Sequence, residues 1–453
     1  MRDLLFTGLF LAMALMALRH AHLGMMLWVW SALFPPNEFL FGFGQGIPFN
    51  KIAVACTVLA LLFDKRRNLT FDALLIWLLL FLGEVSLSFY TAATPPGWGG
   101  EIYERLVKIV MAVLFIRFTV VDRLRLHSIL IGVCLAVGSG AVDEGLKFII
   151  SAGGHHVKGP ASWGDENITA AIILMAMPII FYLYKCSVNK IVRIGVMSTF
   201  IICIVAVIGT YSRGGFVGLF IFYAMSLKSS KNKVVLVVAS LVLIGVGLEL
   251  LPESWFERIH STTDAAQDYS FLGRVIQWKV LTLIALDHPF LGGGILCNGV
   301  PQIWQVYSAR LASELTFIST PPPTTPYASH SIYFQVLGEN GFTGLFLFLI
   351  VFGMGFHLIS DIKKRANTDS SLAWSGELVS SIRMSIVLFL ITGAALPIPY
   401  LEIPYIFIGI LSAVRNIQVT ESKKLLKRGR QAGLSAVKGD PSLRISGKDA
   451  QTT

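Results

Sequence analysis

The chain has 453 residues, of which 54% are hydrophobic and only 14% are charged, and its mean hydropathy is +0.68. A soluble globular protein needs more charge than this to cover its surface, so the composition excludes that class. The net charge of +10 requires no nucleic-acid partner, because contact with anionic membrane lipids accounts for it.

Apolar runs that are long enough to cross a bilayer recur along the chain. They predict an all-α polytopic integral membrane protein with about 12 transmembrane helices. The first two apolar runs are short and could together form one broken crossing. The expected spans are residues 3–17, 22–34, 47–63, 72–90, 103–120, 126–151, 167–184, 191–209, 214–227, 233–250, 341–359, 380–396 and 398–416.

Clusters of Lys and Arg fall at alternate connections between these spans, which by the positive-inside rule predicts that these connections face the cytoplasm. The tail beyond residue 417 adds eight Lys and Arg against three Asp and Glu. The remaining connections are then expected on the outer face, and the largest of them, 251–330, contains six acidic and four basic residues. The basic connections are Lys65–Arg67, Arg123 with Arg125, Lys185 to Arg193, Lys228 to Lys233, and Lys363–Arg365.

This pattern divides the chain into four predicted regions. Residues 1–250 hold the N-terminal transmembrane helices, and 251–330 form an outer loop that contains an amphipathic helix. Residues 331–417 hold the C-terminal transmembrane helices, and 418–453 form a basic cytoplasmic tail. A loop as long as 251–330 usually carries function.

A first polar stretch, Tyr211-Ser-Arg-Gly-Gly215, interrupts two apolar runs. Arg213 could be an interfacial arginine that reaches the lipid headgroups, which is common at the ends of spans. However, the paired glycines allow backbone to approach a bulky ligand, and a guanidinium binds phosphate with two parallel hydrogen bonds. The stretch favours an anion site at Arg213, with Tyr211 as a possible supporting residue.

A second stretch, 272–286, has apolar residues at helical spacing and predicts an amphipathic helix in the outer loop. Arg274 would stand in its first turn, with Gln277 and Trp278 one turn later. A cation at a helix start opposes the helix dipole, and a bound anion between them would explain this placement. The spacing alone is equally consistent with a surface arginine on an interfacial helix.

A third stretch, His330 to Gly341, follows the proline-rich residues 320–326. The nineteen residues 341–359 suffice for a crossing, so His330 is expected on a helical extension just outside the membrane, with Glu339 near the interface. This position makes His330 a candidate base. The outer stretch that ends at Asn167 is a weaker polar signal. No outer loop offers a convincing ligand set, so no metal and no other cofactor is expected.

Together, Tyr-Ser-Arg-Gly-Gly at 211–215, Gly-Arg-Val-Ile-Gln-Trp at 273–278 with His-Pro-Phe-Leu-Gly-Gly-Gly at 288–294, and His330…Leu-Gly-Glu-Asn-Gly341 resemble the bacterial O-antigen ligase and polymerase superfamily. The resemblance covers roughly residues 160–400. The N-terminal Arg-Asp-Leu-Leu-Phe at 2–6 and Leu-Trp-Val-Trp at 27–30 look like the exosortase-associated O-glycosylation ligase branch.

The resemblance implies a metal-independent membrane glycosyltransferase of the GT-C-like type in the bacterial inner membrane, with its active site facing the periplasm. It implies that Arg213 and Arg274 hold the pyrophosphate of an undecaprenyl-pyrophosphate-linked glycan donor, and that His330 acts on the acceptor. The acceptor would be lipid A–core oligosaccharide or a protein hydroxyl, or a second lipid-linked glycan in a polymerase. The alternative function without a catalysed reaction is a lipid-linked-glycan flippase. A flippase should carry charged residues along a central path through the membrane, whereas the candidate residues here lie at the outer face.

Overall fold

The computed structural model describes residues 1–92, 94–229, 269–314, 326 and 328–439 as helices joined by loops, with no strand in these ranges. The predicted span 233–250 lies outside the described residues. The helices are α1 (Arg2–Ala17), α2 (Ala21–Leu33), α3 (Phe49–Phe63), α4 (Ala73–Thr91), α5 (Gly100–Thr119), α6 (Arg123–Ile150), α7 (Glu166–Cys186), α8 (Lys190–Gly209), α9 (Arg213–Ser229), α12 (Tyr269–Asp287), α13 (Pro301–Glu314), α14 (Ile332–Thr368), α15 (Ala373–Thr392) and α16 (Glu402–Gly439).

Short polar side chains fix where several of these helices begin. Asp72, Asp122, Asp165 and Asn189 stand directly before α4, α6, α7 and α8, and the side chain of each accepts a hydrogen bond from a backbone N–H of the first turn. These N–H groups have no partner inside the helix, so a capping side chain stabilises the helix start by about 1 kcal/mol.

Each predicted span in the described ranges coincides with a helix, and the first two apolar runs form the separate helices α1 and α2. Seven helices of the described part are long and apolar enough to cross a membrane, and α2 and α3 are shorter apolar helices. The chain is therefore a polytopic helical membrane protein, while the number of twelve crossings stays a prediction. The helix α13 in the outer loop was not predicted by the apolar pattern.

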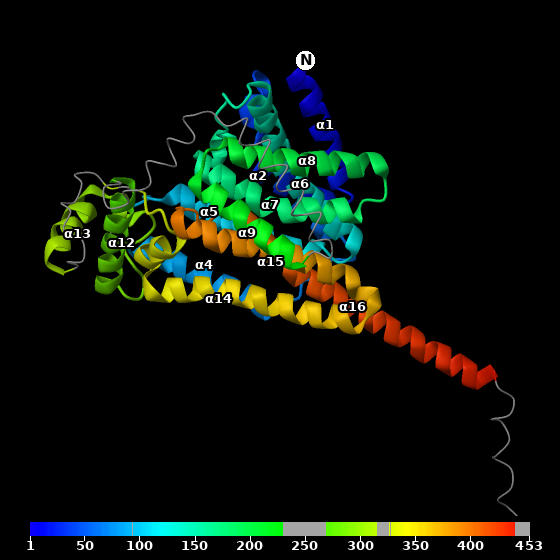
Figure 1. The fold of residues 1–453 in the computed structure, drawn as a ribbon. Coiled ribbons are helices and arrows are strands. Elements are labelled where there is room, and N and C mark those ends of the chain that lie inside the picture. Colours follow the sequence, from blue (N-terminus) through cyan, green and yellow to red (C-terminus); the bar gives the residue numbers. More distant parts are fainter. Residues whose placement is uncertain (93, 230–268, 315–325, 327, 440–453) are drawn as a thin grey trace, which may run out of the picture.

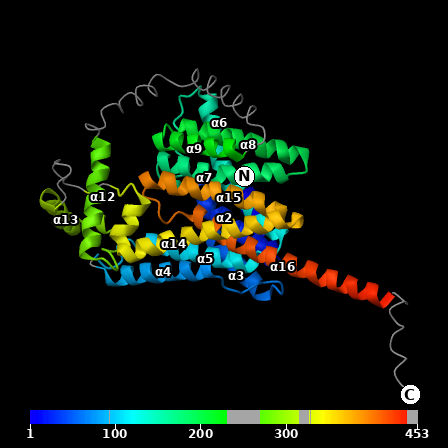
Figure 2. The same cartoon turned by 60° about the horizontal axis from the view of Figure 1, so that its bottom comes forward.

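The long helices lie side by side, and α12 with α13 caps one end of the bundle (Figure 1, Figure 2). The α16 helix projects from the opposite end. We call these the α12 end and the tail end. The α7 helix lies at the centre of the bundle, because α6, α8, α9 and α15 all pack against it. Most of its apolar residues are therefore buried.

The basic connections between helices lie at the tail end of the bundle, and the other connections lie at the α12 end. At the tail end, Arg123 pairs with Glu421 at 2.9 Å, and Arg125 pairs with Asp64. At the α12 end, the indole N–H of Trp98 donates to the carbonyl oxygen of Leu296 at 3.0 Å. This segregation fits a membrane protein with basic connections on one side; which side faces the periplasm stays a prediction.

Candidate functional site

The first motif forms the start of α9, and Arg213 is the first residue of that helix. Ser212 precedes it, and the Ser212 hydroxyl oxygen accepts a 3.1 Å hydrogen bond from the backbone N–H of Gly215. Ser212 is thus the N-cap of α9. Because Ser212 is buried while Arg213 is exposed, the cap fixes the backbone and leaves the guanidinium at the surface of the α12 end.

The start of α7 lies against this cap. The Ser212 hydroxyl donates a 2.8 Å hydrogen bond to the side-chain oxygen of Asn167. Two residues earlier, the Asp165 carboxylate accepts hydrogen bonds from the backbone N–H groups of Asn167 and Ile168, each at 2.9 Å. Asn167 therefore positions the backbone beside Arg213, which is consistent with the supporting role predicted for it.

Arg274 lies in the second turn of α12 rather than in the first, because the helix begins at Tyr269. Phe271 and Leu272 continue the helical pattern of apolar residues, so the helix extends beyond the predicted start at 272. The argument from a helix start therefore does not apply to Arg274. Instead, its Nε is buried and has no hydrogen-bond partner among the described residues. A buried donor of a charged group without a partner is costly, and a bound anion would remove that cost.

His330 lies before α14, which begins at Ile332, and is not part of a helical extension. The backbone at His330 has φ 45°, a left-handed conformation that a non-glycine residue adopts at a cost of about 1–3 kcal/mol. This conformation is incompatible with a continuing helix. It turns the chain between the proline-rich stretch and Ser331, the extended N-cap residue of α14.

The environment of His330 favours the neutral form of its imidazole. Partial burial lowers the pKa of His330 below its usual value of 6.5, and the positive charge of Arg274 lowers it further, while the negative charge of Asp165 opposes this change. Arg274 of α12 and Asp165 at the start of α7 therefore both act electrostatically on His330, which lies in the segment before α14. The ring of His330 makes no hydrogen bond within the described ranges, so it is available to a substrate.

The segment around His330 is held in place by Trp278. The indole N–H of Trp278 donates a 2.9 Å hydrogen bond to the carbonyl oxygen of Ser329, and its ring stacks on Phe334 with centroids 5.0 Å apart. Gln277, its neighbour, is fully buried, and its side-chain oxygen accepts a 3.1 Å hydrogen bond from Asn298. Both residues hold the outer helices together, and the Gln277 side-chain nitrogen is buried without a hydrogen-bond partner among the described residues.

Glu339 is fully buried and joins three segments at the α12 end. One carboxylate oxygen accepts hydrogen bonds from the backbone N–H of Leu296 at 3.0 Å and from the Gln335 amide at 2.9 Å. The other accepts a 3.0 Å hydrogen bond from the Tyr400 hydroxyl. The Gln335 oxygen in turn accepts from Ser329 at 2.8 Å, next to His330. Glu339 was expected near the interface; it lies inside the protein because these partners replace water.

The glycines of the second and third motifs pack against each other. Gly292 has φ 62°, and a side chain there would place its Cβ 2.4 Å from the backbone of Glu339. Gly341 has φ 65° and interrupts α14, and a Cβ there would lie 2.6 Å from the carbonyl oxygen of Pro289. Only glycine allows such an approach. The two glycine-rich motifs thus have a structural role, which is to fix α12 and its following loop against α14.

Tyr211 supports the first motif from the other side. It has φ 51°, and its hydroxyl donates a 2.6 Å hydrogen bond to the carbonyl oxygen of Gly153. The ring of His156 lies 5.3 Å from the Tyr211 ring. These contacts orient the turn that carries Arg213, so Tyr211 is a supporting residue without a visible chemical role of its own.

Asp165 is the residue of this group that the sequence did not single out. The signal was present, since Asp165 directly precedes the apolar run of α7 and is a typical N-cap residue. The spacing could not show that the charge of its carboxylate affects His330. The part of the chain that the structure describes contains no group of three or more His, Cys, Asp and Glu side chains that could hold a metal ion.

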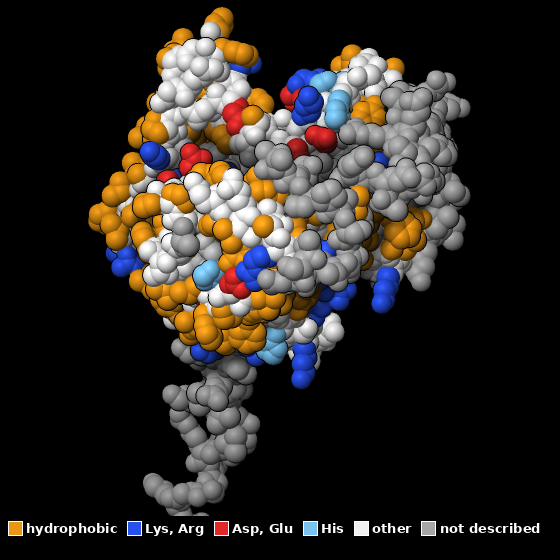
Figure 3. All heavy atoms as spheres, turned by 90° about the vertical axis from the view of Figure 1, so that its left-hand side faces the viewer, with side chains coloured by type: hydrophobic (Ala, Val, Ile, Leu, Met, Phe, Trp, Pro, Cys, Tyr) orange, Lys and Arg blue, Asp and Glu red, His pale blue; other side chains and the backbone are white. Residues whose placement is uncertain are grey.

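The face of the α12 end is shown in Figure 3. Acidic, basic and histidine side chains form a group in the upper part of this face, and in its lower part further basic and histidine side chains lie among many hydrophobic ones. A charged ligand that carries a lipid would meet both kinds of surface there. The arrangement of cation, imidazole and carboxylate can bind an anion and move a proton.

Comparison with known families gives two matches along the chain. Residues 198–349 match the family model described as O-antigen ligase, a range that includes Arg213, Arg274, His330 and Glu339. Residues 1–188 match a family of unknown function (DUF5935). A search of curated proteins gives no match. The segment with all three motifs therefore matches an O-antigen ligase domain, which supports the resemblance to the O-antigen ligase superfamily.

Proposed function

We propose that the protein transfers a glycan from undecaprenyl pyrophosphate to a hydroxyl group of lipid A–core oligosaccharide on the periplasmic face of the inner membrane. The observation that carries this proposal is the unpartnered buried Nε of Arg274, whose positive charge also lowers the pKa of His330. The lowered pKa favours the neutral form of His330, which accepts a proton.

The proposed reaction is a direct displacement at the anomeric carbon. His330 removes the proton from the acceptor hydroxyl, whose oxygen forms the new bond to the anomeric carbon. The bond from that carbon to the pyrophosphate oxygen breaks, and the pyrophosphate leaves with the electron pair. Arg213 and Arg274 stabilise the negative charge of the leaving group. This attack inverts the configuration at the anomeric carbon.

Asp165 has a supporting role in this scheme. When His330 takes up the proton, the imidazolium that forms lies within electrostatic range of the Asp165 carboxylate. A fixed carboxylate favours the charged form of a nearby histidine. Because Asp165 also caps α7, its position is set by the fold. Two arginines neutralise a pyrophosphate without a divalent ion, so the proposed enzyme needs no metal.

The test is transfer by purified protein in nanodiscs. The lipid-linked glycan is supplied with lipid A–core, with a candidate protein, or with no second acceptor, and the products are separated by mass. Glycosylated lipid A–core supports the proposal. A glycosylated protein indicates a protein O-oligosaccharyltransferase, and a lengthened lipid-linked glycan indicates an O-antigen polymerase.

The controls distinguish enzyme from flippase. His330→Ala should abolish transfer, whereas His288→Ala should not, because His288 is an exposed histidine after the end of α12 and outside the site. If the protein moves the donor across a vesicle membrane and forms no covalent product with any acceptor, it is a flippase and the proposed enzyme activity is wrong.

A further inference from the structure

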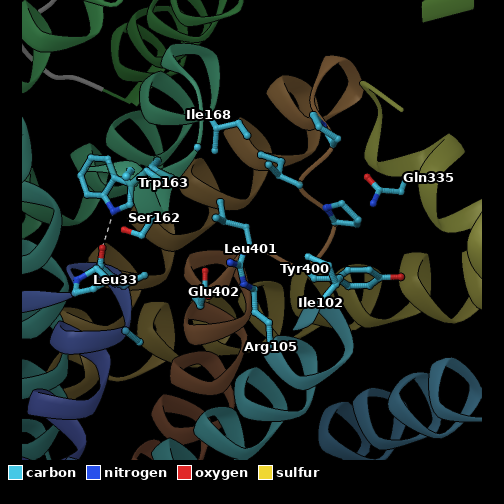
Figure 4. A pocket seen from close by; sticks show the side chains of 18 residues that line it. Leu33, Ile102, Arg105, Ser162, Trp163, Ile168, Gln335, Tyr400, Leu401 and Glu402 are labelled. Carbon is cyan, nitrogen blue, oxygen red and sulfur yellow. Dashed lines mark hydrogen bonds and ion pairs between the residues drawn. The ribbon is translucent and has the colours of Figure 1, made fainter. Parts of the chain in front are cut away.

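A cavity lies at the α12 end and is not lined by the arginines of the candidate site. It has a volume of about 460 Å³ and is partly open. It is lined by the starts of α5, α7 and α16, the loops before α7 and α16, the end of α2 and Gln335 of α14. This volume falls in the range of small-molecule sites. Figure 4 shows the side chains around it. Arg213, Arg274 and His330 do not line it.

One wall of the cavity is polar. Arg105 of α5 and Glu402 at the start of α16 face each other, with a nitrogen and an oxygen 3.8 Å apart. The Arg105 side chain is 48% exposed and the Glu402 side chain 23%. In the described part of the chain, Arg105 makes no hydrogen bond. The exposed Ser162 stands on the same cavity. This wall offers donors and acceptors that a ligand can use.

The other walls are apolar and preformed. Ile102, Ile168 and Leu401 line them together with the aromatic residues Trp163 and Tyr400. The indole N–H of Trp163 donates a 2.6 Å hydrogen bond to the carbonyl oxygen of Leu33, and the Tyr400 hydroxyl donates to Glu339. Since the polar atoms of both aromatic side chains have partners in the protein, their rings need no hydrogen bond from a ligand.

We propose that this cavity is a carbohydrate subsite. Arg105 and Glu402 together carry no net charge, which suits a neutral ligand. Hydroxyl groups both donate and accept, so a sugar can bond to the arginine and to the carboxylate with charge-assisted hydrogen bonds. The C–H faces of a pyranose ring can pack on the apolar walls.

Two other ligand classes fit less well. A hydrocarbon chain would remove water from the Arg105–Glu402 pair without replacing the lost hydrogen bonds, which is costly for charged groups. A phosphate group would bind Arg105 but would lie against the Glu402 carboxylate, and like charges repel. A sugar is the ligand that satisfies both side chains.

The position of the cavity connects it to the proposed reaction. Gln335 lines the cavity, and its oxygen accepts a hydrogen bond from Ser329, the residue before His330. Gly164 also lines it and precedes Asp165. The cavity is therefore linked to the segment of the proposed base through Gln335 and Ser329. The role of a sugar in the cavity rests on the proposed function, because it belongs either to the donor glycan or to the acceptor.

The experiment uses three variants and one matched control in nanodiscs. Glu402→Gln removes one charge at constant size, Arg105→Gln removes one charge and shortens the side chain, and Ser162→Trp places a large ring against the cavity from an exposed lining position. Lys108→Gln is the control, because Lys108 lies one turn further along α5, pairs with Glu104 and does not line the cavity. Kinetics are measured separately against donor and against acceptor concentration.

We expect the three variants to raise one KM by roughly tenfold or more, as is typical when hydrogen bonds to charged groups are lost, with kcat nearly unchanged. The KM that rises identifies the sugar as the donor's or the acceptor's. If it is the donor's, the effect should vanish with a donor that carries a single sugar and persist with a shortened polyprenyl chain. An effect that follows the length of the polyprenyl chain, or variants that match Lys108→Gln, would overturn the proposal.

A second readout does not depend on transfer. Saturation-transfer NMR with the free glycan, released from the donor or from the lipid A–core by mild acid, should show binding to the wild type and loss of binding in Ser162→Trp. If the wild-type protein binds the free glycan but transfers no glycan, the proposed activity is rejected and the proposed subsite is retained. Transfer without binding of either glycan would reject the subsite alone.

Discussion

The hydroxyl of Ser212 donates a 2.8 Å hydrogen bond to the side-chain oxygen of Asn167 and thereby joins the start of α9 to the start of α7. The same Ser212 oxygen accepts from the N–H of Gly215 and caps the helix that begins with Arg213. One hydrogen bond thus connects the proposed phosphate-binding arginine to the segment that carries Asp165.

Asn167→Ala removes the acceptor of this bond. Losing a neutral hydrogen bond costs about 0.5–1.5 kcal/mol, so we expect donor KM to rise by up to roughly tenfold, with a small change in kcat. The measurement is steady-state transfer at varied donor concentration. Glu166→Ala, one residue earlier, is the control. Equal KM values in the two variants would show that the Asn167 bond does not position Arg213.

Arg213→Lys and Arg274→Lys keep the charge but lose the two parallel hydrogen bonds of a guanidinium. Hydrogen bonds to charged groups contribute about 1.5–3 kcal/mol, so each variant should lose most of its activity and still insert normally. Transfer and membrane insertion are measured together. Arg310→Lys, which alters the Arg310–Asp287 pair in the outer helices, should stay active. Wild-type turnover in Arg213→Lys would make Arg213 an ordinary interfacial arginine.

His330→Ala should reduce turnover by roughly 10²–10⁴, the usual contribution of general base catalysis. Donor affinity should survive, because the arginines hold the phosphates. The two quantities are measured side by side, with donor binding followed by a titration of the labelled lipid. Lost affinity with unchanged chemistry would make His330 a donor ligand, and no change in either would make it structural.

The pH dependence follows from the lowered pKa of His330. A base acts in its neutral form, so the rate should fall as the pH drops through a pKa below 6.5 and stay level above it. Asp165→Asn removes a charge that raises this pKa and keeps a capping side chain, so the fall should move to lower pH. A fall that moves to higher pH in Asp165→Asn would contradict the assigned electrostatics.

Transfer should persist when divalent ions are removed with EDTA. Arginines take the role that a metal ion has in many reactions of pyrophosphates. Activity is compared in EDTA, in magnesium and in manganese after exhaustive dialysis. Activity that disappears in EDTA and returns with either metal would show that the enzyme requires a metal ion.

Residues 251–330 should lie in the periplasm and the tail beyond 417 in the cytoplasm. Single cysteines at Ser308 and Ser435, in a background without the five native cysteines, are labelled from outside intact cells with an impermeant reagent. Only the cysteine at 308 should react. Reaction of both would show that the predicted topology is wrong.

Hydrophobic periodicity and local chemistry were sufficient to predict much of the fold. Each predicted span in the described ranges forms a helix because a bilayer requires long apolar runs with internal hydrogen bonds. The pairing of Lys147 with Asp143 and Glu144 was also predictable, since residues three and four apart share one helix face. The three motifs were recognisable because their residue types are restricted by chemistry and by close backbone packing.

Only the tertiary structure decided which of these residues meet. Asp165 and Arg274 lie in separate helices, and no periodicity relates either of them to His330, yet both affect its charge. The cavity between Arg105 and Glu402 likewise depends on how α5 and α16 pack. Local sequence determines where helices begin and which faces are apolar, whereas contacts between distant segments depend on the packing of the whole bundle, which no local pattern encodes.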